Sequence, residues 1–177
     1  RHAEDAAASK FIVMAEVSVT TAADELDPPG DAGSGVSLRE AVRDAVPGTR
    51  IRFDALQFKD DAKLVIAADK GEVAITKNLL IDASALPQGI TLHAPAGGYR
   101  SLFVGSEAQV EIVNVTFTAE DMGGPGSGDG GAIENNGTLT LRRCRFLHNG
   151  GGGNGGAIHS TGDLTIERCV FDGNVSN

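Results

Sequence analysis

Apolar and polar residues alternate over short stretches along most of this chain. Leu139 and Leu141 are separated by one polar residue, and so are Cys144 and Phe146 a few positions further on. A period of two places successive side chains on opposite faces of an extended strand. Gly or Asn residues separate these stretches and favour tight turns. The pattern therefore predicts short strands, each with one apolar face, joined by turns.

Two blocks of twenty residues repeat each other. Residues 130–149 align without a gap on residues 155–174 at an offset of 25, and more than half of the aligned positions are identical. Each block contains three strand patterns, and stacked turns of a solenoid lie roughly 4.8 Å apart. Phe146 is therefore expected directly over Phe171. The repeat predicts an all-β fold: a right-handed parallel β-helix, which is a three-sided solenoid.

Earlier turns are less regular but follow the same scheme. Residues 101–117 repeat the pattern at an offset of 29, so that Phe117 takes the place of Phe146. The additional residues fall in the glycine-rich segment 121–129, which a solenoid tolerates as a loop at a corner. Further strands are expected at residues 50–53, 63–67, 72–75, 78–82 and 90–93.

One segment has the periodicity of a helix. Leu38, Ala41 and Val42 share one face at helical spacing, and Ser37 precedes Glu40 by the three residues of a capping box. In a chain that otherwise predicts strands, such a helix would cover the first turn of the solenoid. It would hide apolar side chains and the unpaired amides of the edge strands. We therefore expect one short amphipathic helix that caps the N-terminal end.

These patterns divide the chain into three regions. Residues 1–16 are expected to be an N-terminal extension, residues 17–48 a capping segment with the amphipathic helix, and residues 49–177 the turns of the β-helix. No capping pattern follows the last predicted turn. We expect a solenoid truncated at its C-terminus, which is either a fragment of a longer β-helix or a docking end. Self-association, or addition of a strand such as residues 10–15 of a neighbour, would pair that edge.

Two short motifs resemble known families. Residues 36–41, Val-Ser-Leu-Arg-Glu-Ala, resemble the N-terminal CSLREA domain of bacterial cell-surface β-helix proteins. The Gly-Gly-Ala-Ile and Phe-x-x-Asn units resemble the repeats of polymorphic outer-membrane proteins. The resemblance implies an extracellular or cell-surface protein in which the β-helix is an adhesive or structural stalk, and it supplies no catalytic residues. Val36 stands where the family has a leading cysteine, so a cap disulfide usual in that family is not expected.

Composition and charge narrow the range of partners. Lys and Arg total 15 against 24 for Asp and Glu, which gives a net charge of -9. An acidic surface repels phosphate backbones, so no nucleic-acid partner is expected. The apolar run at residues 11–15 is far shorter than the roughly 20 residues needed to cross a bilayer, so no membrane span is expected. A chain of 177 residues has room for one continuous core.

The repeated polar and sulfur-containing positions predict structural roles. Cys144 and Cys169 occupy the same inward position of adjacent turns and are expected to be stacked free thiols in the core. A disulfide or a metal site between them stays an alternative, although the two side chains would lie parallel rather than facing each other. Asn149 and Asn174 are expected to form a ladder of amides at a corner and to satisfy backbone groups of the turns.

An enzymatic function is the alternative to a scaffold, because parallel β-helices include polysaccharide-active enzymes such as pectate lyases. Acidic side chains do not recur at one position of the turns, so no catalytic residue is assigned. For a face that binds a glycan or another surface ligand, the best candidates are Glu134, His159 and Asp163. No cofactor is expected, with calcium as the alternative. The turn aspartates that calcium would use are Asp60, Asp61, Asp121 and Asp129.

Overall fold

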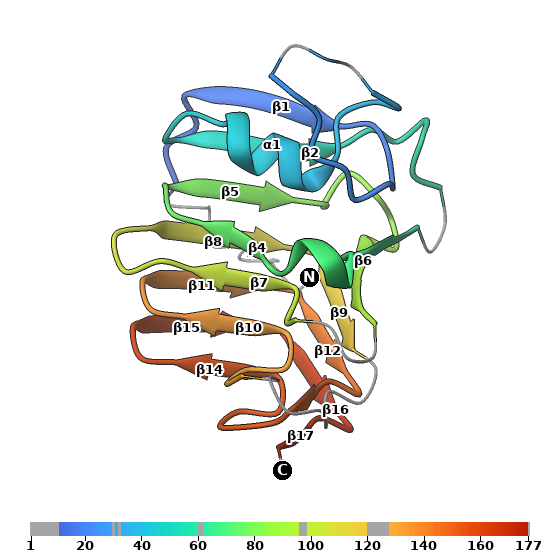
Figure 1. Ribbon diagram of the computed structural model, residues 1–177. Coiled ribbons are helices and arrows are strands. Elements are labelled where there is room, and N and C mark those ends of the chain that lie inside the picture. Colours follow the sequence, from blue (N-terminus) through green and yellow to red (C-terminus); the bar gives the residue numbers. More distant parts are fainter. Residues whose placement is uncertain are drawn as a thin grey trace, which may run out of the picture.

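The computed structural model describes residues 11–29, 31, 33–59, 62–95, 99–119 and 128–176. In these residues nearly all regular structure is parallel β, with one short α-helix, and the strands form a solenoid of about 4 turns. Three sheets run along the solenoid, one for each side (Figure 1). The predicted three-sided parallel β-helix is confirmed.

The first sheet, here called sheet A, is the largest. Its order is β1-β2-β5-β8-β11-β15, and every neighbouring pair is parallel. The strands are β1 (Ala15–Val19), β2 (Thr49–Phe53), β5 (Leu79–Asp82), β8 (Gln109–Val113), β11 (Thr138–Arg142) and β15 (Asp163–Glu167).

Sheets B and C form the other two sides. Sheet B consists of β3 (Lys63–Val65), β6 (Ile90–Ala94), β9 (Val115–Ala119), β12 (Arg145–Leu147) and β16 (Val170–Asp172). Sheet C consists of β4 (Val73–Ile75), β7 (Leu102–Val104), β10 (Ile133–Asn135) and β14 (Ile158–Ser160). A further pair joins β13 (Gly150–Gly151) to β17 (Val175–Ser176).

The chain visits the sheets in a fixed order, so each turn contributes one strand to each side. The sequences β2-β3-β4, β5-β6-β7, β8-β9-β10 and β11-β12-β14 make four turns, and β15 and β16 begin another. Strand β1 extends sheet A by pairing with β2, so the segment before the helix already belongs to the solenoid. Each strand expected in the less regular turns is present, with bounds that differ by one or two residues.

The register of the sheets follows the sequence repeat. Leu139 lies opposite Leu164 at the offset of 25, and opposite Val110 at the offset of 29. Inside the solenoid, the rings of Phe117 and Phe146 stack at 4.8 Å with their planes 7° apart. Phe171 continues this stack at 4.7 Å and 5°. Equivalent side chains therefore lie directly over one another.

The corner between sheets A and B has the same backbone conformation in successive turns. The equivalent corner residue has a φ of 59° at Asn114 and of 54° at both Arg143 and Arg168. Gly89 takes this position one turn earlier with a φ of 71°. A Cβ atom at Gly89 would lie 2.1 Å from the carbonyl oxygen of Asn114, so glycine is required there. The shared left-handed corner keeps the turns aligned.

The predicted capping helix is α1 (Leu38–Asp44), and it lies at the same end of the solenoid as β1 (Figure 1). The capping box is present: Ser37 Oγ accepts a hydrogen bond from the Glu40 backbone amide at 3.1 Å, and Glu40 Oε2 accepts one from the Ser37 amide at 2.9 Å. Leu38, Ala41 and Val42 belong to the buried core. The helix therefore closes the apolar interior of the first turn, as its pattern predicts.

A buried ion pair fastens this cap to the first turn. Arg39 of α1 forms two hydrogen bonds of 2.8 Å with the carboxylate of Asp24, and the two side chains are only 10% and 8% exposed. The same guanidinium donates to the carbonyl oxygens of Gly71 and Glu72, next to the 3-10 helix η1 (Ala68–Lys70). Asp24 also accepts from the backbone amide of Ala67 at 2.7 Å. This network joins the capping segment to the connection between β3 and β4.

We predict that Arg39→Ala lowers the free energy of unfolding by about 3 to 5 kcal/mol, because the buried Asp24 carboxylate loses its cation. Urea denaturation followed by circular dichroism measures the loss. The control is Arg52→Ala, since Arg52 pairs with Glu16 at 2.7 Å in a setting where the side chains are 41% and 44% exposed. That change should cost at most about 1 kcal/mol. Equal losses in the two variants would contradict the role of the buried pair.

Candidate functional site

The predicted carbohydrate face is divided between two sides of the solenoid. Glu134 of β10 and His159 of β14 are direct neighbours in the register of sheet C. Asp163 begins β15 and belongs to sheet A, beyond the corner that follows β14. The structure thus brings Glu134 and His159 together and places Asp163 on a different sheet.

An arginine that the sequence analysis did not single out organises the charges around Glu134. Arg100 is 14% exposed, donates from Nε to Glu72 at 2.6 Å and also pairs with Glu134. The guanidinium donates in addition to the carbonyl oxygen of Asp129, whose carboxylate lies 3.7 Å from His159 Nε2. Arg100 therefore links separate turns on this side, and both glutamates are engaged in ion pairs. Its position ahead of β7 lies outside the repeated blocks, so no pattern indicated this role.

A second charged network lies on the outer face of sheet A. Arg142 of β11 contacts Glu111 of β8 at 2.9 Å and Glu167 of β15 at 2.7 Å. The side chains of Arg142 and Glu111 are 15% and 7% exposed, whereas Glu167 is 37% exposed. The offset of 25 in the repeat already places Arg142 beside Glu167, but Glu111 joins from a turn of different length. One guanidinium thus bridges three successive turns.

A small groove on the same face is lined by apolar, neutral polar and charged residues, among them the three members of this network. Its volume is about 170 Å³. Phe11, which precedes β1 in the sequence, contributes an aromatic wall next to strands that lie several turns further along the chain. The complete lining is Phe11, Gln109, Val110, Glu111, Thr140, Arg142, Thr165 and Glu167. Sequence reasoning missed this groove because its residues come from four separate segments.

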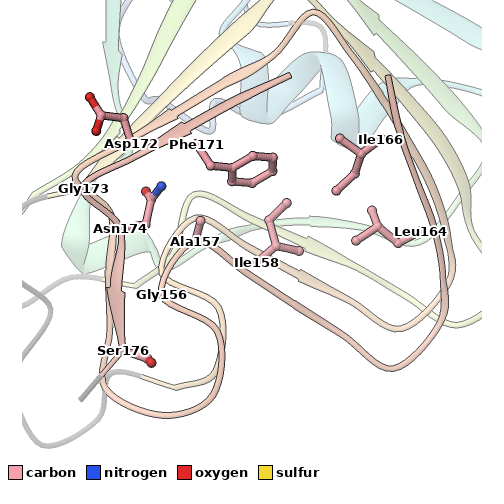
Figure 2. Close-up of a pocket in the computed structure, with 10 residues that line it drawn as sticks. All are labelled: Gly156, Ala157, Ile158, Leu164, Ile166, Phe171, Asp172, Gly173, Asn174 and Ser176. Carbon is pink, nitrogen blue, oxygen red and sulfur yellow. The ribbon is translucent and has the colours of Figure 1, made fainter. Parts of the chain in front are cut away.

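The last described turn has a hollow end. Phe171 and Ile166 occupy inward positions, yet they are 46% and 45% exposed. In Figure 2 the side chains of Leu164, Ile166, Ile158 and Phe171 point into the same hollow. The hollow measures about 500 Å³. Its remaining lining is Gly156, Ala157, Asp172, Gly173, Asn174 and Ser176.

Near this end, the asparagine side chains form a ladder. Asn149 donates from its backbone amide and from Nδ2 to Asn174 Oδ1, at 3.0 and 2.8 Å. Asn174 Nδ2 donates in turn to the carbonyl oxygen of Phe146 at 2.9 Å. Asn149 Nδ2 makes the equivalent contact with Phe117 O at 3.1 Å. These bonds join adjacent turns and satisfy corner backbone groups, which is the arrangement the sequence predicts.

Both cysteines are free thiols that lie in adjacent turns. The backbone amide of Cys144 lies 3.4 Å from Cys169 Sγ, and Cys144 is fully buried while Cys169 is partly exposed. A hydrogen bond from the Cys144 thiol lowers the pKa of Cys169 to about 7, although burial opposes this shift. The same hydrogen bond, together with burial, raises the pKa of Cys144. The pair therefore has one reactive and one inert member.

Of the four turn aspartates that calcium would use, the structure describes one. Asp60, Asp61 and Asp121 lie outside the described residues. Asp129 accepts a hydrogen bond of 2.6 Å from the backbone amide of Asn154. Among the side chains that the structure describes, no group of three or more His, Cys, Asp or Glu residues has an arrangement that could hold a metal ion.

We predict that iodoacetamide modifies Cys169 with a midpoint near pH 7, because the thiolate is the nucleophile, while buried Cys144 stays unmodified. Peptide mass spectrometry after brief alkylation across a pH series measures both sites. In Cys144→Ala the thiol donor to Cys169 is lost while the backbone amide donor stays, so the midpoint should rise part of the way toward the ordinary value of about 8.5. Equal modification of the two thiols in the unchanged protein would refute this assignment.

Three comparisons with known proteins return no match: neither protein-family models, nor curated proteins, nor solved structures resemble this chain significantly. The functional assignment therefore depends on the geometry of the chain itself.

Proposed function

We propose that this β-solenoid scaffold acts at the cell surface or outside the cell, as an adhesin or a structural stalk. The observation that carries this proposal is the linkage between turns on the outer faces. Arg100 and Arg142 each bridge carboxylates from different turns, while the Phe and Asn ladders join the turns inside. A rod locked in this way resists bending and offers long, regular flanks for contacts.

The capping segment supports a relationship to CSLREA-type surface proteins. Four of the six motif residues have a defined task in the cap: Ser37 and Glu40 form the capping box, Leu38 packs in the core, and Arg39 holds Asp24. The motif therefore works as one unit that closes a solenoid. An end-capped β-helix suits the stalk role that the resemblance implies. Among the described residues no helix has the length and apolar character of a membrane span.

We predict that the chain binds at least one class of glycan on an immobilised array, because an adhesive flank presents ordered polar groups to a ligand. The array is read with calcium and with a chelator, and binding that survives the chelator indicates that the flank works without the ion. An array surface without glycan is the control. Absence of binding to every glycan would contradict the adhesive role. Release of cleaved oligosaccharides would instead favour a polysaccharide-active enzyme.

We also propose that the hollow end packs against a second copy of the chain. The apolar residues Ile166 and Phe171 are exposed, and β15 and β16 are the outermost strands of sheets A and B in the described part of the chain, which favours a further layer of protein over this turn. The same surface on two copies can meet about a two-fold axis.

Light scattering coupled to size-exclusion chromatography tests this contact. We predict concentration-dependent association of the unchanged chain and a monomer for Ile166→Lys, because a charge would be buried in the contact. The control is Val65→Lys, which places the same charge on a residue of β3 that is 44% exposed. It should leave association unchanged. A monomer at all concentrations in the unchanged chain would refute the contact.

A further inference from the structure

The groove on the outer face of sheet A has the composition of a site for a sugar ring. Phe11 supplies an apolar aromatic surface, and Gln109, Thr140 and Thr165 supply neutral groups that both donate and accept hydrogen bonds. A pyranose has C–H groups on its faces and hydroxyl groups around its rim. One aromatic wall and a set of polar groups are therefore the complementary surfaces for it.

The charged groups of the groove are held in place before any ligand arrives. Arg142 is fixed between Glu111 and Glu167 at 2.9 and 2.7 Å, and these residues project from three hydrogen-bonded strands. Side chains fixed on regular strands lose little conformational entropy when a ligand binds. Glu167, with 37% of its side chain exposed, is the carboxylate most accessible to a ligand.

We propose that this groove binds one neutral or amino-substituted sugar unit of a surface glycan. The inference rests on the proposed adhesive function and assigns that function to a site. The lining includes two carboxylates, of Glu111 and Glu167, and one guanidinium, of Arg142, so the local net charge is -1. This field attracts an ammonium group, tolerates neutral hydroxyls and repels the carboxylate of a uronic acid. The groove therefore discriminates against the acidic polymers that a pectate-lyase-like enzyme would need.

The size of the groove limits both the ligand and its affinity. A volume of about 170 Å³ is smaller than the roughly 300 to 1,000 Å³ of sites for drug-sized ligands, so it accommodates one ring rather than an extended oligosaccharide. A ligand of this size is expected to bind with a Kd of about 1 mM. Weak single sites suffice for adhesion when many copies of the chain face many glycans, because avidity multiplies the affinity.

The probes for the test are methyl glucoside, glucosamine and glucuronate. Binding is followed by NMR, through saturation transfer to each sugar and through amide shifts of Thr140 and Thr165. We expect methyl glucoside and glucosamine to bind with a Kd of about 1 mM, and glucuronate at least about tenfold more weakly. Preferential binding of glucuronate, or shifts confined to residues outside the groove, would overturn the assignment.

Three variants separate the groups that form the groove. Phe11→Ala removes the aromatic wall and Thr165→Val removes one hydroxyl without changing the shape, so each should weaken binding at least about fivefold. Glu167→Gln keeps the shape but removes a charge, and it should reduce the preference for glucosamine over glucuronate. Asp69→Asn makes the same change in charge on the 3-10 helix η1, where the Asp69 side chain is 81% exposed, and it should leave binding unaffected. Circular dichroism verifies that each variant is folded.

The outcomes distinguish this site from the broader function. If the glycan array shows binding that all three groove variants retain, the groove is the wrong site while the adhesive function stands. If neither the array nor the three probes show binding, both proposals fail. Loss of binding in Phe11→Ala and Thr165→Val, with normal binding in Asp69→Asn, supports the groove.

Discussion

The in-register stacking of parallel strands is the constraint on which the rest of this structure depends. Each strand pairs with strands of the turns before and after it, as in sheet A, where β1, β2, β5, β8, β11 and β15 form a single parallel series. Strand spacing then places equivalent side chains directly over one another, as the ring separations of 4.8 and 4.7 Å along Phe117, Phe146 and Phe171 illustrate. A change in any turn is therefore transmitted first to its two neighbours.

This constraint has different consequences inside and outside the solenoid. Inside, identical groups repeat, and the asparagine ladder turns that repetition into hydrogen bonds between Asn149 and Asn174. Outside, repetition of one charge would be repulsive, and the chain places Arg142 between Glu111 and Glu167 instead. At the N-terminal end the helix α1 covers the first turn, and the ion pair between Arg39 and Asp24 holds it there. The ladders inside, the ion pairs on the flanks and the capped end therefore all follow from the in-register stacking of the turns.

The proposed functions use the surfaces that this system leaves available. Strands of fixed spacing hold polar groups on a flank at constant positions, which favours recognition of a ligand over the large movements needed by a gated active site. The hollow at the last described turn is the apolar counterpart, because its inward residues Ile166 and Phe171 are 45% and 46% exposed, whereas their equivalents in earlier turns are buried. In these proposals the outer face of sheet A binds a small polar ligand, and the apolar hollow contacts a second copy of the chain.

The sequence by itself determined the fold class, the register of the repeated turns and the capping helix. Alternation reports which face of a strand is buried, the offset of the repeat reports how many residues make one turn, and Ser37 with Glu40 forms a local hydrogen-bond pattern. Only the tertiary structure decided that Arg39 reaches Asp24, that Arg100 joins Glu72 to Glu134, and that Phe11 forms a wall over sheet A. These contacts depend on the path of irregular corners and connections, whose lengths vary from turn to turn. Periodicity describes the strands that repeat, but it contains no information on which distant side chains the connections bring together.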